Sequence, residues 1–330
     1  MSARKLSVAV VQGGPSSEAE VSRASATSVA RALEAAGHRV VRLELNAYLA
    51  ESLRSGGYEV VFPVSHGAVG EDGSLQGLLE VLDMPYVGSG VLASALAMNK
   101  RTAKVLFATA GLPVAPAFDA RRGDDAHAIA TRALAELGAL LVVKPCSNGS
   151  AIGVARFDKG TDVNALTAAI AAAWEVDEHV LIERFAPGRE VTCGVHGTGE
   201  EARALPPTEI RSPNDAFYTY QARYAPGRSE HLCPAPIGGA LVKRVQEVAV
   251  AAHRTLGCRD LCRADFVVDD AAGDVTLLEI NTMPGFTDTS LYPEAAGIAG
   301  MAMKELCDGF VQAAARRGAP QRNLALALPR

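Results

Sequence analysis

The stretch from Arg263 to Leu291, whose first part has the form of a β-hairpin, constrains the fold of this chain more than any other feature. Two apolar runs flank a turn at 269–274 that is rich in Asp, Ala and Gly, which is the pattern of two antiparallel strands. Folding the strands about this turn places Asp265 opposite Glu279. Because side chains alternate between the two faces of a strand, one face is expected to carry Arg263, Asp265, Val267, Leu277, Glu279 and Asn281.

The facing carboxylates predict a bound cation. Like charges across a β-ladder repel each other, so a solvated hairpin end is the simplest alternative. The hairpin is, however, apolar on both faces near its turn, unlike a half-exposed one, and its polar groups gather at the opposite end. Buried carboxylates without partners are costly or become neutral. The oxygen donors Asp265, Glu279 and Asn281 therefore predict a Mg²⁺ site.

The composition is that of a globular protein with more than one lobe. Its 330 residues exceed the roughly 250–300 at which single cores stop growing. The net charge is −5 and charged residues are interspersed, so nucleic acid is not an expected partner. No apolar run approaches the roughly 20 residues of a membrane span, and an early strand leaves no room for a signal peptide. We therefore expect a cytoplasmic protein without a membrane partner.

The six cysteines are scattered along the chain, and Cys258 and Cys262 are the closest pair. A CxxxC spacing without a second such pair is a weak zinc signal. Reduced thiols in a cytoplasmic protein are the simpler interpretation.

The N-terminal residues have the pattern of a doubly wound α/β lobe. A buried parallel strand at 6–11 leads into Gly13-Gly14, and the elements that follow are a helix at 20–36 and strands at 38–43 and 60–64. The GxGxxG spacing of dinucleotide sites is missing. The same strand–glycine–helix geometry can instead bring Glu18 and a helix N-terminus to a ligand.

A glycine-rich loop at 66–73 follows the third strand. It lies beyond the carboxyl end of that strand, where open α/β sheets bind ligands. For His66 a structural role and a ligand-binding role are equally consistent with this position. A helix at 75–82 and a turn at 85–90 end the lobe.

The middle of the chain carries two lysines that suit a phosphate site. A helical stretch at 91–110 contains Lys100, and a strand at 140–143 leads into Lys144 and a loop of small residues. Amides and an ammonium group in such a loop can hold phosphates, although the P-loop motif is absent. The remaining elements are predicted as a helix at 124–137, a strand ending at Phe157, a helix at 161–174 and a strand at 179–184.

A long segment at 211–232 lacks clear periodicity and contains four aromatic residues. Loops of this length in compact proteins are lids, binding loops or disordered segments, and the aromatic residues favour a lid. It lies between a strand at 191–195 and a helix at 239–256, and a loose tail is expected from about Gly318.

These features together resemble the ATP-grasp superfamily and, within it, the D-alanine–D-alanine ligases. The matching motifs span most of the chain and comprise 13–22, 66–73, 85–90, 143–145, 217–224, 278–281 and 284–291. The resemblance implies an α/β, three-lobed ATP-grasp fold. Its lobes would be an N-terminal doubly wound lobe at 1–88, a central lobe at 89–186 and a C-terminal lobe at 187–330.

The resemblance also implies the nucleotide and metal ligands. ATP would contact Lys100, Lys144 and Arg223 through its phosphates, Glu183 through adenine and Glu190 through ribose. Two Mg²⁺ ions, with Mn²⁺ as an alternative, would bind Asp265, Glu279 and Asn281.

The implied substrate contacts come from all three lobes. The first amino acid would contact Glu18 and His66, and the second would contact Ser290 and Leu291. Arg263 and the amide of Gly285 would stabilise the developing oxyanion. Glu18, Ser150 and Tyr224 would form a hydrogen-bonded group that joins the lobes around the substrates.

The implied reaction is ATP-dependent ligation of two D-alanines to D-alanyl-D-alanine through an acyl phosphate, for peptidoglycan precursor synthesis. A homodimer with the N-terminal lobe at its contact is expected. One alternative is a related ligase with a different second substrate, such as D-serine, D-lactate or a secondary-metabolite amino acid. A nucleotide-binding regulatory protein would need a broken metal or phosphate site, and both patterns are intact in the sequence.

Five residues differ from those common in the family: Asn99, Asn148, Ala151, Arg223 and Met283. None removes a metal ligand or a phosphate lysine, so an active enzyme is expected. Relatives that use D-lactate carry a histidine where Tyr224 stands. Tyr224 therefore favours an amine nucleophile, and Leu291 supports a small apolar second residue.

Overall fold

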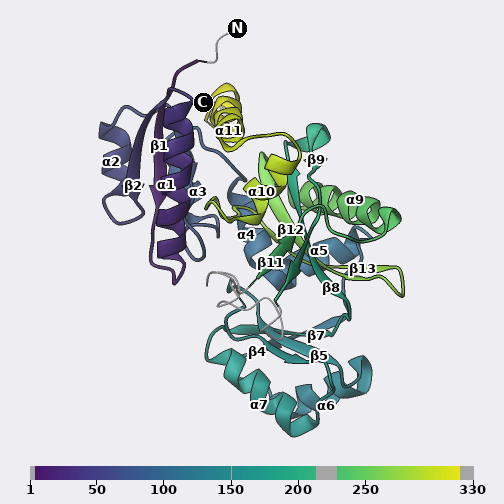
Figure 1. Cartoon of the computed structure of the whole chain (residues 1–330). Helices are drawn as coiled ribbons and strands as arrows, with labels where there is room; N and C mark the ends of the chain where they lie inside the picture. Colours follow the sequence, from purple (N-terminus) through teal and green to yellow (C-terminus); the bar gives the residue numbers. More distant parts are fainter. Residues whose placement is uncertain (1–3, 150, 213–228, 320–330) are drawn as a thin grey trace, which may run out of the picture.

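The computed structural model describes residues 4–149, 151–212 and 229–319, which form an α/β protein with three separate sheets (Figure 1). The predicted α/β class is thereby confirmed. Among the described residues, no helix is both long and apolar enough to cross a membrane.

The N-terminal sheet is parallel and has helices on both faces. Its strand order is β2-β1-β3, with β1 at Ser7–Gln12, β2 at Arg39–Glu44 and β3 at Val60–Pro63. Alternate residues of β1 point to opposite sides, as Val8 and Val10 face one core and Ala9 and Val11 another. The first core contains α1 (Ala19–Ala35), and the second contains α2 (Leu49–Ser55) and α3 (Ser74–Val81).

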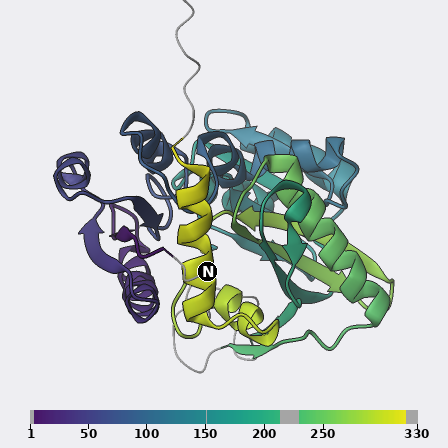
Figure 2. The same ribbon diagram turned by 90° about the horizontal axis from the view of Figure 1, so that it is seen from above.

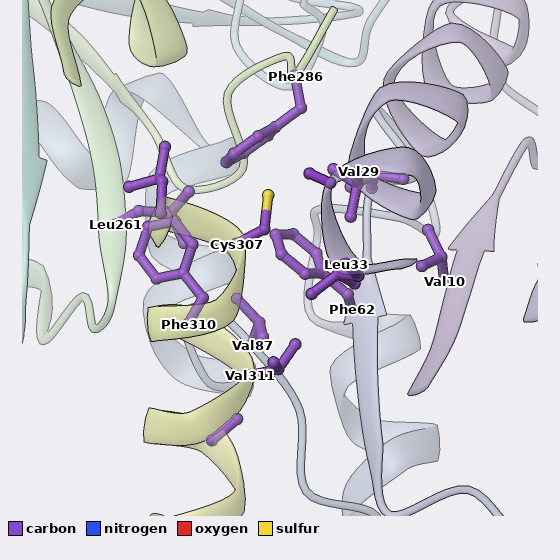
Figure 3. Close-up of a cluster of buried hydrophobic side chains, with 14 of the residues drawn as sticks. Val10, Val29, Leu33, Phe62, Val87, Leu261, Phe286, Cys307, Phe310 and Val311 are labelled. Carbon is purple, nitrogen blue, oxygen red and sulfur yellow. The ribbon is translucent and has the colours of Figure 1, made fainter. Parts of the chain in front are cut away.

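The C-terminal helices complete this N-terminal core. After α10 (Leu291–Ile298), helix α11 (Met303–Arg317) packs along α1, between the N-terminal sheet and the rest of the molecule (Figure 2). Phe310 of α11 meets Phe62 of β3 and Phe286 edge to face, with ring centroids 6.2 and 6.3 Å apart. Val29, Leu33 and Val311 close the same cluster (Figure 3). Segments from both ends of the chain therefore share one core.

A four-stranded antiparallel sheet forms the second unit. Its order is β4-β7-β5-β6, with bounds Ala117–Arg121, His179–Arg184, Leu141–Pro145 and Ala155–Phe157. Helices α6 (Ala126–Leu137) and α7 (Val163–Trp174) cover one face, where Val143 and Ile182 are buried. The other face carries Lys144 and Glu183.

The third sheet is the largest and carries the hairpin. Its order is β11-β10-β8-β12-β13, with a short β9 (Arg203–Ala204) paired to β8. The bounds are Glu230–Leu232 for β11, Thr208–Arg211 for β10, Arg189–His196 for β8, Leu261–Asp269 for β12 and Asp274–Asn281 for β13. One face packs against α4 (Val91–Met98), α5 (Lys100–Thr109) and α9 (Gly239–Leu256). The short 3-10 turn η1 lies at Gly199–Glu201.

The hairpin has the predicted pairing at its polar end and a different register near its turn. Asp265 pairs with Glu279, as expected, but Phe266 pairs with Leu277 and Val267 with Thr276. Leu278 is therefore the extra residue of a β-bulge. The prediction that Val267 shares a face with Leu277 is wrong, because the bulge reverses the alternation. Leu278 and Glu279 consequently line the same cavity.

The lobe boundaries at 88/89 and 186/187 stay predictions. The hydrophobic cores are assembled from segments that are distant in sequence: α4 and α5 pack on the large sheet, and α11 packs on the N-terminal one.

Candidate active site

Two neighbouring cavities contain most of the predicted site residues. The larger, of about 440 Å³, lies between the N-terminal lobe and the large sheet. The smaller, of about 160 Å³, lies between the two antiparallel sheets. Lys100, Gly149 and Glu279 line both cavities. A ligand in one cavity can therefore reach a ligand in the other beside these three residues.

The smaller cavity has apolar walls and one buried charged cluster. Its apolar walls leave a slot suited to a flat ring and are formed by Val142 of β5, Ile152 and Val154 of the loop before β6, and Val267 and Leu278 of the hairpin. The bulge is what turns Leu278 into this slot. Glu190, at the end of the slot, lies on β8 opposite Val267.

The charged cluster joins Glu183 to two lysines. Its carboxylate lies 2.6 Å from Lys144 Nζ and 2.9 Å from Lys104 Nζ. Burial alone would raise the pKa of Glu183, but the two ammonium groups outweigh it and lower that pKa. The same carboxylate raises the pKa of Lys144 against the opposing effect of burial. Glu183 and Lys144 therefore each stabilise the charged form of the other.

Lys104 is a site residue that sequence reasoning missed. It lies on the buried stripe of α5 with Ala103 and Phe107, and it also donates to the carbonyl of Ala115. Burial lowers the pKa of Lys104, and Glu183 only partly offsets that effect. A lysine at an apolar helical position signals a buried anionic partner, so the spacing alone could have indicated it.

Lys100 stands where the two cavities meet. Its Nζ lies 3.0 Å from Glu279 Oε2 and donates to the carbonyl of Asn148 at 2.7 Å. Asn99 ends α4 in an extended conformation and caps α5 by accepting from the Thr102 amide. The Lys100 amide in turn donates to Cys146. An Asp at position 99 would cap α5 equally well, so this departure keeps the local structure.

The acidic end of the hairpin lies beside Lys100. Asp265 accepts two hydrogen bonds from Arg263, at 2.8 and 2.9 Å, and one from Thr192 Oγ1 at 2.7 Å. Asn281 Oδ1 accepts from the Met283 amide at 2.9 Å. Glu279 and Asn281 line the larger cavity, whereas Asp265 is not among the described lining residues. Thr192, on the neighbouring strand, is a second contact that sequence reasoning missed.

The oxygen-only donor set of this hairpin fits Mg²⁺. A carboxylate has about four lone-pair positions and an amide oxygen has two, so the hydrogen bonds to Asp265 and Asn281 leave lone pairs open. Hard oxygen ligands are those that Mg²⁺ prefers. The residues present are therefore compatible with the predicted ion.

The larger cavity also brings Glu18 and His66 together. His66 Nδ1 lies 3.8 Å from Glu71 Oε1. Burial would lower the pKa of His66, but the nearby carboxylates of Glu71 and Glu18 outweigh burial and raise that pKa. These two carboxylates therefore stabilise the imidazolium form relative to that of an exposed histidine. Glu71 was not singled out from the sequence, although it lies in the glycine-rich loop.

The loop that carries Gly285 and Ser290 closes the other side of this cavity. Ser290 Oγ accepts from the Thr287 amide at 2.9 Å, and a Cβ on Gly285 would lie 2.9 Å from that same Oγ. Glycine is therefore required at this close approach. Ser25 of α1 accepts from the Phe286 amide at 3.1 Å, which ties the loop to the N-terminal helix. Leu291 is buried against Ile210.

Three predicted residues, Ser150, Arg223 and Tyr224, lie outside the described residues. The predicted lid at 211–232 is described at its ends, where Arg211 of β10 pairs with Glu230 of β11. Glu209, buried on β10, accepts from Arg189 at 3.2 Å and from Arg211 at 2.8 Å. The two ends of the segment therefore leave from adjacent, ion-paired strands.

Comparison with known proteins gives consistent relatives along the chain. Residues 47–89 match the family described as D-ala D-ala ligase N-terminus, and residues 106–312 match D-ala D-ala ligase C-terminus. The D-alanine–D-alanine ligase of Desulforudis audaxviator is 43% identical, with 94% of this chain and 99% of the relative covered. That of Xanthobacter autotrophicus is 44% identical, with 92% and 97% covered.

Solved structures give the same result. The D-alanine–D-alanine ligase of Bacillus anthracis complexed with ATP superposes with a TM-score of 0.80 at 28% identity, over 94% of this chain and 98% of that one. The Coxiella burnetii ligase has a TM-score of 0.80 at 28% identity, over 96% and 95%. The predicted ATP-grasp fold is therefore confirmed, and the chain belongs to the D-alanine–D-alanine ligase family.

Proposed function

We propose that this protein joins two D-alanines to D-alanyl-D-alanine with ATP, as a step of peptidoglycan precursor synthesis in the cytoplasm. The observation that carries the proposal is the junction of two cavities at Lys100, Gly149 and Glu279. The reaction requires a nucleotide phosphate to meet a substrate carboxylate, and the junction provides that meeting point. Family membership supports the choice of substrates.

In this proposal the smaller cavity holds ATP. Adenine occupies the apolar slot beside Glu183, and ribose lies at Glu190. The phosphates extend along Lys144 and Lys100 toward the larger cavity, with Arg223 of the lid as a third cation. Fixed ammonium groups that are already paired need little reorganisation when phosphate charge arrives.

Asp265, Glu279 and Asn281 would hold the two Mg²⁺ ions, with Mn²⁺ as an alternative. When bound, these ions neutralise charge on the phosphates and orient them. Arg263 and Lys100, which contact the carboxylates of Asp265 and Glu279, would share these groups with the metal.

The larger cavity holds the two amino acids. Glu18 and His66 position the first D-alanine, and Ser290 with Leu291 surrounds the second. Arg263 and the Gly285 amide donate to the oxyanion that develops when the amine attacks. Ser150 and Tyr224 complete the group that includes Glu18, and the lid excludes water from the intermediate.

The ligation has two chemical steps, and in both of them these side chains position the reactants. A carboxylate oxygen of the first D-alanine attacks the γ-phosphorus of ATP, and the bond to the leaving ADP oxygen breaks. The neutral amine of the second D-alanine then attacks the acyl carbon of the resulting acyl phosphate, a mixed anhydride. Inorganic phosphate leaves with the bonding electrons, and the amine gives up a proton to form the amide.

The test is phosphate release with ATP, Mg²⁺ and D-alanine, combined with mass spectrometry of the product. We expect D-alanine-dependent phosphate release and stoichiometric D-alanyl-D-alanine, with no response to L-alanine. ATP turnover that does not depend on D-alanine, or a different product when amino-acid pairs are screened, would contradict the proposal.

We also infer a homodimer that contacts through the N-terminal lobe and the adjoining helix α4. Val81 of α3 is 71% exposed and Leu92 of α4 is 70% exposed, and these helices pack against each other. Such apolar side chains at adjacent surface positions suit a contact. Light scattering should give a dimer mass that falls to the monomer in Val81→Glu/Leu92→Glu. A monomeric wild type would refute the inference.

A further inference from the structure

A buried cluster of one histidine and two cysteines lies outside the proposed active site. The ring nitrogen of His253 and the sulfur atoms of Cys258 and Cys262 all lie within 4.8 Å of one another. The three side chains are 0–3% exposed, in the core between α9 and β12. No part of the proposed ligation uses them.

The backbone brings these side chains together through a tight turn. Helix α9 ends at Gly257, which adopts φ +70° and so reverses the chain. The Cys258 amide then donates to the His253 carbonyl at 2.9 Å, which places Cys258 beside the last turn of the helix. Cys262 follows on β12, and its sulfur lies 3.1 Å from His253 Nδ1. Two of the three groups are thus held on secondary structure and the third on a hydrogen-bonded turn.

The protonation chemistry of the cluster suits metal ligation. Burial lowers the pKa of His253 to about 4, so the ring stays neutral and keeps a lone pair. Hydrogen bonding from Cys262 lowers the pKa of Cys258 against the effect of burial, and the Ser89 hydroxyl adds to this lowering. Without an ion, Cys262 keeps its proton, because burial raises its pKa. With a divalent ion bound, both cysteines would be thiolates. The ion and the two thiolates would then have no net charge, which a dry core tolerates.

We propose that His253, Cys258 and Cys262 form a structural site for a soft divalent ion such as Zn²⁺. An ion at the centre of a triangle with sides of at most 4.8 Å lies roughly 2–2.8 Å from each corner, a range that includes the usual Zn–N and Zn–S distances. Binding replaces the two thiol protons, which pass to solvent.

The donor chemistry separates this site from the hairpin site. Sulfur and imidazole select Zn²⁺ over Mg²⁺, whereas the carboxylates of the hairpin do the reverse. Occupancy would clamp α9 to β12, the strand in which Cys262 directly precedes Arg263. We therefore expect stabilisation of the fold without a direct part in catalysis.

The first experiment uses Co²⁺ as a spectroscopic probe of the full-length wild type. The protein is reduced with a phosphine and kept in excess Mg²⁺, which occupies oxygen-only sites. We expect one Co²⁺ per chain with thiolate-to-cobalt charge-transfer absorption, release of about two protons per ion, and displacement of Co²⁺ by Zn²⁺. Absence of the charge-transfer band overturns the proposal. It is also overturned if the reduced protein binds no ion and Cys258 and Cys262 instead form a disulfide once the reductant is removed.

Variants then assign the band to this cluster. Cys258→Ser and Cys262→Ser should each lower the affinity for Co²⁺ by more than the roughly 10–100-fold that outer-shell changes cost. Cys307→Ala is the matched control, because Cys307 is equally buried but lies in the α11 core. D-alanine-dependent phosphate release shows whether each variant is folded. An unchanged band in either serine variant, or its loss in Cys307→Ala, refutes the assignment.

Discussion

At the scale of single residues, the buried Glu183 and its two lysine partners make the smaller cavity sensitive to charge. Glu183→Gln leaves Lys104 and Lys144 facing each other, and an unbalanced buried charge costs about 3–5 kcal/mol. Lys104→Met leaves a balanced pair and should cost less. We expect urea unfolding at pH 7 to show a larger loss of unfolding free energy for Glu183→Gln than for Lys104→Met. Equal losses would mean that the lysines are screened by water.

The same carboxylate gives a pH dependence with a defined sign. The pKa of Glu183 is lowered in the folded protein from an ordinary value of 4.5. Its contribution to stability is therefore complete above that value and is lost as the pH falls through the folded-state pKa. The difference in unfolding free energy between wild type and Glu183→Gln should be constant from pH 6 to 8 and shrink below about pH 4.5. If this difference in unfolding free energy instead grows as the pH falls, the pKa of Glu183 is raised in the folded protein and not lowered.

Glu279 lines both cavities and is one of the proposed metal ligands. Glu279→Gln keeps the shape but removes a metal ligand and the partner of Lys100. We expect a native fold and a fall in kcat of about 10²–10³, the size of losing one charge-stabilising group, with a steeper Mg²⁺ dependence. Asp274→Asn, at the exposed turn of the same hairpin, is the control. Unchanged turnover at limiting Mg²⁺ would remove Glu279 from the site.

We propose that Tyr224 selects the second substrate. D-alanine brings an amine, whereas D-lactate brings a neutral hydroxyl and a carboxylate that a histidinium could pair with. The tyrosine hydroxyl, with an unperturbed pKa of about 10, stays neutral and does not repel an ammonium group. In competition from pH 6 to 9, wild type should form mainly the dipeptide, increasingly as pH rises. Tyr224→His should shift the product toward the D-lactate ester at low pH.

Two results would remove Tyr224 as the selector: a wild type that prefers D-lactate throughout, or an unchanged product ratio in Tyr224→His. Because an apolar pocket such as that at Leu291 rejects an added hydroxyl by only about a hundredfold, D-serine should be a weak substrate in both proteins. This comparison separates lid selection from pocket selection.

At the scale of elements, the α4–α5 junction fixes Lys100. Asn99→Ala removes the cap of α5 and should lower the unfolding free energy by about 1 kcal/mol. Because Lys100 follows directly, we also expect a higher KM for ATP with little change for D-alanine. Asn99→Asp restores the cap and should restore both values. If the KM for ATP stays unchanged in Asn99→Ala, Lys100 is held by its own contacts to Cys146 and Asn148 and not by the helix cap.

The elements themselves were largely predictable, because each follows a local pattern. The apolar runs predicted β1, β5 and β7, and the symmetry of the hairpin predicted the pairing of Asp265 with Glu279. The bulge at Leu278 was not predictable, since one unpaired residue leaves the apolar pattern unchanged and only the neighbouring strand reveals the shift. Val267 was therefore predicted on the wrong face, whereas Asp265 and Glu279, beyond the bulge, were predicted correctly as directly opposite each other.

At the scale of the whole molecule, the sequence could not say which distant elements share a core. The apolar stripe of α11 is visible as a pattern, but its packing against α1 depends on the path of the intervening chain. The buried position of Lys104 could be read from the spacing of α5, but its partner Glu183 lies on β7, and the sequence does not show that the two meet. The resemblance to a family, rather than periodicity, supplied the residue roles.

The shared core predicts that the two substrates respond to different parts of the molecule. Phe310 packs on Phe286 and Tyr292, which directly follow Gly285 and Leu291 of the larger cavity. Phe310→Ala should lower stability by about 3–5 kcal/mol and raise KM for D-alanine, because the loop at 285–291 loses its support. The KM for ATP should change little.

The matched control is Ile170→Ala in α7, within the core of the four-stranded sheet that carries Lys144 and Glu183. It removes a fully buried side chain of the other lobe, at a cost of about 2–5 kcal/mol, and should raise KM for ATP while leaving D-alanine unaffected. Urea unfolding and steady-state kinetics measure both effects on the same samples. If both variants raise the two KM values together, the cores act as one unit. If Phe310→Ala raises only the KM for D-alanine and Ile170→Ala raises only the KM for ATP, each core supports its own cavity. Lys100 and Glu279 are then the junction between the two cavities.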